Sequence, residues 1–202
     1  MPSLGFSRAV RFVLFVVPLF AAVSVQAASV EDSSAFVKRL GDRTIEVLTN
    51  ESYSAEDRMF HYRQLLREGF AVNTIARFAL GRYWRAASPA LREEYLVLFR
   101  EFVLDIYSKR LDGFSGETFT IIEALSIDET DAMVSTEISG GDGPPIRVDY
   151  RVRVHDGVLQ IVDVLVEGIS LIITQRSEFA SVINREGLEG LMDKLRQYNK
   201  NN

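Results

Sequence analysis

The segment Val158–Val166, which reads VLQIVDVLV, restricts the fold more than any other part of the chain. Its composition favours a β-strand, but apolar residues occupy both alternating sets of positions, so both faces of the strand must be covered. After Gly168 a new pattern recurs at helical spacing, in Ile169, Ile172, Arg176, Phe179 and Ile183. Glycine permits a sharp change of direction at this junction. We therefore expect the helix after Gly168 to cover one face of the strand and the main helix of the chain to cover the other.

Three further strands are predicted before this one, at hairpin spacing: Glu117–Leu125, Ala132–Ile138 and Ile146–Val154. The connections read DET, GGDGPP and HDG, which are turn compositions. In the third strand the apolar side chains alternate with the charged series Arg147, Asp149, Arg151 and Arg153. This pattern predicts an antiparallel meander with one apolar face and helices packed over it.

Helical periodicity occurs on both sides of the strands. A first helix is expected over Asp32–Leu48, capped by Ser33 or Ser34, with the stripe Phe36, Val37, Leu40, Val47 and Leu48. Further helices are expected from a capping box at Ser54, over Asn73–Leu80, from Ser88-Pro89 to about Leu111, and over 169–200. The fold class is therefore α+β, with a twisted four-stranded antiparallel sheet packed against N- and C-terminal helices.

The N-terminal segment has the features of a secretion signal. Arg8 and Arg11 precede the short apolar run Phe12–Val25, and small residues at Val25 and Ala27 suit a signal peptidase. We expect a cleaved signal peptide over 1–27, export to a Gram-negative periplasm, and a single domain over 28–202. A retained anchor is the alternative, but the run is short for a membrane span of ~20 residues and contains Pro18.

Charge and cysteine content exclude several classes of protein. Without Arg8 and Arg11 the 23 basic residues fall to 21 against 28 acidic residues, a net charge of −7. An acidic chain without a basic stripe is a poor candidate for nucleic-acid binding. The chain has no cysteine, so its stability depends on the packed core without disulfide support.

Candidate catalytic residues are few. The two histidines, His61 and His155, have no metal-binding spacing, and GGDGPP joins two strands where a phosphate-binding loop would precede a helix. Asp163 and Glu167 share the alternating set Leu159, Ile161, Asp163, Leu165 and Glu167. If that set faces inward, the two carboxylates are candidates for a catalytic base. The other interpretation is that they pair with arginines of the third strand or with Arg176.

Several blocks of sequence resemble a known family. They are IARFALGRYWRAASP (75–89), PIRVDYRVR (145–153), VDVLVEGISL (162–171) and RSEF (176–179), and together they span most of the chain after the signal peptide. In this order they are similar to the MlaC-like, toluene-tolerance family of periplasmic phospholipid-binding proteins. The resemblance implies a hydrophobic pocket between sheet and helices that holds acyl tails. It also implies a non-enzymatic carrier without a cofactor, which moves phospholipid between an inner-membrane ABC transporter complex and an outer-membrane lipoprotein–porin complex.

A set of apolar residues from the strands and helices is predicted to line such a pocket: Ile75, Phe78, Phe99, Phe102, Ile106, Val134, Ile138, Val148, Tyr150, Val152, Val162 and Val164. A filled core explains each of them equally well, since periodicity does not separate a core from a cavity. Tyr83 and Trp84 suit a pocket mouth or the closure of a short helix. Arg82 and Arg85 suit a head-group phosphate or surface ion pairs, and Arg176 is expected to tie the last helices to the sheet.

Three other functions remain open at this point. The first is a carrier of hopanoid or another lipid. The second is an enzyme on a curved sheet that uses Asp163 or Glu167, and the third is a protein-interaction module. A carboxylate inside a cavity would favour the enzyme, and a large exposed apolar patch without an enclosed cavity would favour the interaction module.

Overall fold

The structure is a computed structural model and describes residues 29–109, 114, 116–140, 143–155 and 157–201. The expected signal peptide, the end of the long helix near Leu111 and part of the GGDGPP turn lie outside these residues. The helices are α1 (Val30–Thr49), α2 (Ala55–Gly69), α3 (Val72–Leu80), α4 (Tyr83–Ala86), α5 (Pro89–Lys109) and α6 (Leu171–Asn201). The strands are β1 (Thr118–Ser126), β2 (Asp131–Ser139), β3 (Ile146–His155), β4 (Val158–Val166) and β5 (Ile169–Ser170).

Helix starts follow local capping chemistry, with one correction. Ser54 and Asp57 form the expected capping box, in which each backbone N–H donates to the other side chain at 3.1 Å. Ser88 Oγ likewise accepts from Leu91 N at the start of α5. The cap of α1, however, is Ser29, whose Oγ accepts from Asp32 N at 2.9 Å. The prediction of Ser33 or Ser34 was wrong because α1 begins at Val30, two residues before the predicted start at Asp32.

The sheet is an antiparallel meander in the order β1-β2-β3-β4-β5, which has five strands where the sequence predicts four. The additional strand, β5, has two residues and pairs with the end of β4. The pairing arises because Glu167 (φ 50°) and Gly168 (φ 77°) both take left-handed backbone conformations. Positive φ at both central residues produces a tight two-residue hairpin, so the chain turns back onto the sheet before α6 starts.

A β-bulge explains why β4 is apolar on both faces. Opposite β3, Arg151 pairs with Asp163 and Val152 pairs with Ile161, which leaves Val162 as the extra residue. The alternation of side chains therefore reverses at Val162. As a result Ile161 shares the apolar face with Val152, whereas Asp163 lies opposite Arg151, and the single alternating set predicted over 159–167 is wrong.

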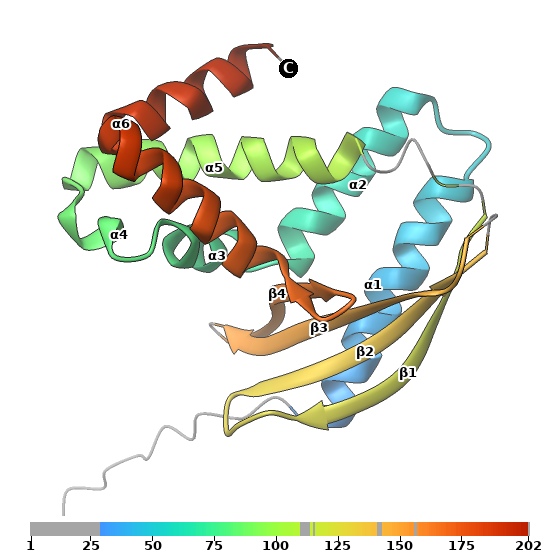
Figure 1. Ribbon diagram of the computed structural model, residues 1–202. Helices are drawn as coiled ribbons and strands as arrows, with labels where there is room; N and C mark the ends of the chain where they lie inside the picture. Colours follow the sequence, from blue (N-terminus) through green and yellow to red (C-terminus); the bar gives the residue numbers. More distant parts are fainter. Residues whose placement is uncertain (1–28, 110–113, 115, 141–142, 156, 202) are drawn as a thin grey trace, which may run out of the picture.

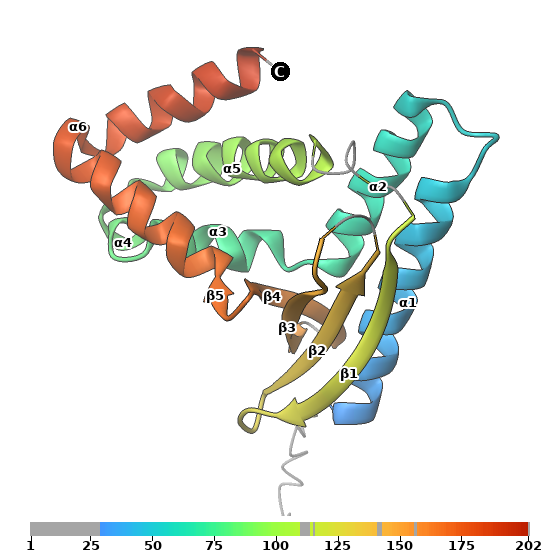
Figure 2. The same cartoon turned by 45° about the vertical axis from the view of Figure 1, so that its right-hand side comes forward.

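Two groups of helices flank the sheet. In Figures 1 and 2, α1 lies along the sheet beside β1 and β2, and its contacts extend to β3. The helices α3, α5 and α6 pack on one another beyond β4, and α2 joins the two groups by contacts with α1, α5 and β4. Each group has its own buried core, one around Val37, Val134, Val152 and Ile161 and the other around Tyr95, Phe99, Phe179 and Met192. The candidate site lies where the two groups meet.

Candidate functional site

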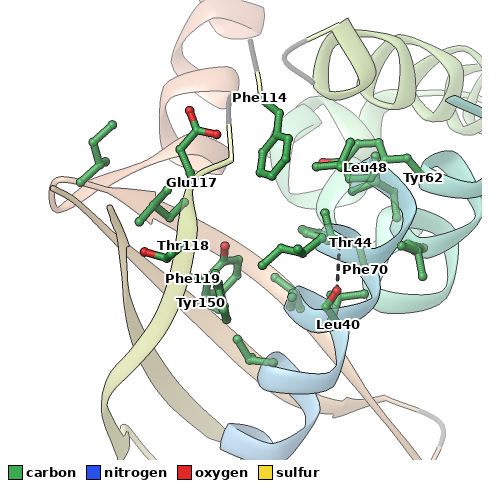
Figure 3. Close-up of a pocket in the computed structure, with 18 residues that line it drawn as sticks. Leu40, Thr44, Leu48, Tyr62, Phe70, Phe114, Glu117, Thr118, Phe119 and Tyr150 are labelled. Carbon is green, nitrogen blue, oxygen red and sulfur yellow. Dashed lines mark hydrogen bonds between the residues drawn. The ribbon is translucent and has the colours of Figure 1, made fainter. Parts of the chain in front are cut away.

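The first apolar cavity, cavity 1, lies between α1, α2 and the inner face of the sheet (Figure 3). Its volume is about 370 Å³. Aliphatic and aromatic side chains dominate the lining, which consists of Val37, Leu40, Gly41, Thr44, Ile45, Leu48, Tyr62, Leu65, Leu66, Phe70, Phe114, Glu117, Thr118, Phe119, Ile138, Ile146, Tyr150 and Ile161. Ile146 is 45% exposed, so the cavity reaches the surface at that edge of the sheet.

Polar groups in cavity 1 are few and mostly engaged. Thr44 Oγ1 donates to Leu40 O at 2.8 Å, and Thr118 Oγ1 donates to Ser139 O at 3.0 Å. Burial raises the pKa of the Tyr150 phenol well above its ordinary value, so this hydroxyl stays protonated and uncharged at neutral pH. Figure 3 shows Glu117 and Thr118 at the side of the cavity formed by the start of β1. The interior is therefore uncharged, and the one acidic side chain of the lining stands at this edge.

A second apolar cavity, cavity 2, lies between α3, α5, the start of α6 and β4, with a volume of about 260 Å³. Its lining consists of Leu66, Phe70, Val72, Ile75, Ala79, Phe99, Phe102, Val103, Leu104, Ile106, Tyr107, Val162, Asp163, Val164, Leu171, Ile172, Thr174, Gln175 and Glu178. The exposed Thr174 and Glu178 belong to the first turns of α6. Cavity 2 therefore reaches the surface along α6, away from the Ile146 edge of cavity 1.

Asp163 is the one carboxylate that borders cavity 2 from the sheet, and its oxygens are engaged in capping α6. Oδ2 accepts from Ser170 Oγ at 2.6 Å, and Oδ1 accepts from Ile172 N at 3.3 Å. A carboxylate at a helix N-terminus stabilises the unpaired N–H groups and the helix dipole. Asp163 thus orients the start of α6 against β4. These hydrogen bonds make it a helix cap, whereas the sequence suggested a pairing with an arginine.

Glu167 stands in the β4–β5 turn and lines neither cavity. Its Oε1 accepts from the backbone N of Arg147 at 2.6 Å. Glu167 therefore does not border a cavity beside Asp163: the bulge at Val162 precedes both residues, and it is the turn after Val166 that takes Glu167 out of the strand.

Eight of the twelve predicted lipid-binding residues line a cavity. Ile138 and Tyr150 line cavity 1, and cavity 2 is lined by Ile75, Phe99, Phe102, Ile106, Val162 and Val164. Val134, Val148 and Val152 line neither cavity, because they are buried in the sheet (at most 6% exposed). Phe78 also lines neither: it is 43% exposed on α3, where the Arg176 guanidinium lies 5.0 Å from its ring centroid.

Sequence reasoning missed the contribution of α1 and α2 to the site. Leu40, Ile45 and Leu48 of α1 and Leu66 of α2 line cavity 1. The apolar stripe over 36–48 was the available signal, and it was used only to predict a helix. A cavity wall and a core wall have the same helical periodicity, so the stripe could not distinguish them.

The expected mouth residues lie elsewhere. Tyr83 OH donates to Asn184 Oδ1 at 2.7 Å, and the Trp84 ring is flanked by the guanidinium groups of Arg77 and Arg92 at 5.3 and 5.4 Å. Neither aromatic residue lines cavity 1 or 2, so they close the turn around α4. Arg176 connects α6 to α3 through Phe78, rather than to the sheet as expected.

The part of the chain that the structure describes contains no group of three or more His, Cys, Asp or Glu that could hold a metal ion. His61 stacks on the ring of Tyr53 at a centroid distance of 4.5 Å. No helix within the described ranges is long and apolar enough to cross a membrane.

Comparison with known proteins places the chain in a family. The family model described as "MlaC protein" matches residues 38–197, which is most of the chain and includes every lining residue of both cavities except Val37. The chain belongs to the MlaC family. The resemblance predicted from the sequence blocks is therefore confirmed.

Two curated relatives and one solved structure extend the comparison with the MlaC family. The toluene tolerance protein ttg2D of Pseudomonas putida is 24% identical over 52% of this chain and 49% of its own length. The intermembrane phospholipid transport system binding protein MlaC of Haemophilus influenzae is 21% identical over 58% of this chain and 57% of its own. The chain thus spans about half the length of these curated relatives in the matched region.

A phospholipid-binding protein from Ralstonia solanacearum, solved in complex with a phospholipid, has the same fold. It superimposes with a TM-score of 0.72 over 84% of this chain and 97% of its own, at 22% sequence identity. This likeness confirms the α+β architecture of an antiparallel sheet with N- and C-terminal helices.

Proposed function

We propose that this chain is a non-enzymatic phospholipid carrier that shelters acyl tails in the two apolar cavities while the head group stays near solvent. The observation that carries the proposal is the pair of adjoining cavities at the junction of the sheet and the helices, inside an MlaC-family fold. The phospholipid bound by the Ralstonia protein of the same fold supports the same ligand class here.

The physical requirement for such a carrier is a dry interior. Two acyl tails carry roughly 30 methylenes, and each methylene gains about 0.8 kcal/mol on leaving water. A bilayer offers the tails the same gain, so only an apolar interior lets a water-soluble protein compete for them. The uncharged interior of cavity 1 meets this requirement, and Asp163 in cavity 2 caps α6, which is a structural role.

We also propose that the carrier works in the periplasm and exchanges lipid with two membrane complexes. The expected signal peptide over 1–27 supports export. The Haemophilus relative, which is named as a binding protein of an intermembrane phospholipid transport system, supports the transport role. The partners would be an inner-membrane ABC transporter complex and an outer-membrane lipoprotein–porin complex, and the result would be maintenance of outer-membrane lipid asymmetry.

The test is to purify the exported protein and identify what it carries. Native mass spectrometry followed by lipid extraction should detect intact phospholipid at defined stoichiometry. Delipidated protein should take phospholipid back from vesicles, and an added hopanoid should not displace it. Protein that carries no lipid and extracts none would contradict the proposal, preferential uptake of hopanoid would change the cargo, and recovery of hydrolysed lipid would favour an enzyme.

A pair of variants locates the binding to cavity 1. Ile45 of α1 lines the cavity, and Ile45→Asp places a carboxylate beside the bound tail, where burying a charge is costly. We expect the variant to lose most of its bound lipid in the vesicle assay. Ala35→Asp adds the same charge at an exposed position of the same helix that lines neither cavity and should bind as the native chain does. Equal lipid retention by both variants would place the ligand elsewhere.

A further inference from the structure

Cavities 1 and 2 share one wall. Leu66 and Phe70 line both of them, and both residues belong to the C-terminal end of α2. Figure 3 labels Phe70 between Thr44 and Leu40, on the side of cavity 1 away from β1. These two side chains therefore stand between the two apolar spaces.

The backbone around Phe70 is held firmly, whereas its ring has open space beside it. Phe70 N donates to Leu66 O at 3.1 Å, and Ala71 N donates to Ile161 O of β4 at 3.0 Å. Phe70 is only half-buried and lies between the two cavities. A change of side-chain rotamer can therefore move the ring without disturbing the hydrogen bonds that fix α2 to β4.

Neither cavity alone has the size expected for a diacyl lipid. Sites for drug-sized ligands measure about 300–1,000 Å³. Cavity 1, at about 370 Å³, falls near the lower end of that range, and cavity 2, at about 260 Å³, falls below it. A phospholipid with two tails of roughly 15 methylenes each is larger than such ligands, so its tails need both spaces.

We propose that Phe70, supported by Leu66, is a movable partition that sets the acyl-chain capacity of the protein. When the ring turns aside, the two cavities join, and the distal part of at least one tail passes from cavity 1 into cavity 2. The lipid enters at the exposed Ile146 edge of cavity 1, and cavity 2 receives the tail end. This inference rests on the proposed function and adds a specificity-determining residue to it.

The experiment maps the position of a tail end directly. Delipidated protein is loaded with phosphatidylcholine that carries a photoreactive diazirine at the end of one acyl chain, irradiated, and analysed by peptide mass spectrometry. In the native chain we expect labels in peptides of both cavities, including those that contain Ile45 and Phe102. Phe70→Trp enlarges the partition and should abolish labelling of cavity 2, whereas Phe70→Ala removes it and should increase that labelling.

The control truncates a ring that lies outside both cavities. Phe60→Ala, at a 57% exposed position of α2, removes the same number of atoms as Phe70→Ala without touching either lining, so labelling of cavity 2 should stay at the native level. Labels confined to cavity 1 in the native chain and in Phe70→Ala would overturn the proposal. Labels in cavity 2 that persist in Phe70→Trp would also overturn it.

Two further measurements keep these outcomes distinct. Circular dichroism checks that each variant folds. If Phe70→Trp does not fold, Leu66→Phe replaces it, because it enlarges the other side chain that lines both cavities. Native protein that retains no labelled lipid would contradict the proposed function itself. Retained lipid whose labelling pattern does not change when residue 70 is substituted would contradict only the partition.

Discussion

At the scale of single residues, the outer face of the sheet depends on one buried acid. Asp131 is 1% exposed and receives hydrogen bonds from Arg151 and from Arg153, whose Nη2 lies 2.8 Å from Oδ2. Burial opposes ionisation of Asp131, but the two arginines outweigh it and lower the pKa of the carboxyl below its usual value near 3.8. Within the predicted row of arginines, Arg151 and Arg153 therefore pair with Asp131, next to the DET turn, and Arg147 pairs with Asp149.

Asp131→Ala should lower the free energy of unfolding by about 2 kcal/mol, since hydrogen bonds to charged groups contribute roughly that much. Because the folded-state pKa is depressed, this contribution is present above the unfolded-state pKa and is lost as the pH falls through the folded-state value. Urea unfolding should therefore show a constant difference from the native chain between about pH 5 and 8 and a shrinking one in acid. Asp42→Ala breaks an exposed pair with Lys38 and should change little. An equal loss in both variants would contradict the assigned role.

At the scale of elements, the tight β4–β5 hairpin determines where α6 begins. The turn places Ser170 beside Asp163, and these two residues then cap the first turn of α6. The sequence predicted a change of direction at Gly168 but not the two-residue strand that follows. A strand of two residues is too short to show any periodicity in the sequence. Its pairing is created by positive φ at two successive residues.

Gly168→Ala tests this turn. A Cβ at Gly168 meets no heavy atom within 4 Å, so the cost comes from the φ of +77° alone, about 1–2 kcal/mol for a residue with a side chain. We expect that loss in the free energy of unfolding, measured in urea. Gly143→Ala is the matched control, because a Cβ there also meets open space and its φ lies outside the strained range. Indistinguishable stabilities for the two variants would show that the turn relaxes without cost.

At the scale of the whole molecule, the candidate site depends on two packed bodies that α2 joins. One body is the sheet with α1, and the other is the group α3, α5 and α6. Each has a buried core; cavity 1 opens in the first body between α1, α2 and the sheet, and cavity 2 opens where β4 meets the second body. Unfilled apolar volume lacks dispersion contacts, so an acyl chain that occupies it should stabilise the folded state.

Thermal unfolding tests that expectation on the complete protein. A ligand at about 100 times its Kd adds roughly 2.7 kcal/mol, which for a chain of this size raises Tm by on the order of 5–10 °C. We expect phospholipid-loaded protein to melt higher than delipidated protein by that amount, by differential scanning calorimetry. Ile45→Asp should remove most of this increase in Tm, because the added carboxylate disfavours binding of the acyl tail. Identical melting of loaded and delipidated native protein would mean that the lipid does not occupy the cavities.

The sequence by itself determined helices α1, α2, α3, α5 and α6, the four long strands and their antiparallel order, because periodicity and turn chemistry act between neighbours along the chain. It also carried the blocks that place the chain in the MlaC family. Only the tertiary structure decided which apolar residues border open space and which fill a core. Val134 and Val162 look alike in sequence, yet Val134 is buried beneath α1, and Val162 sits in a bulge on the wall of cavity 2. That difference depends on where side chains from distant elements fail to meet, which no local pattern records.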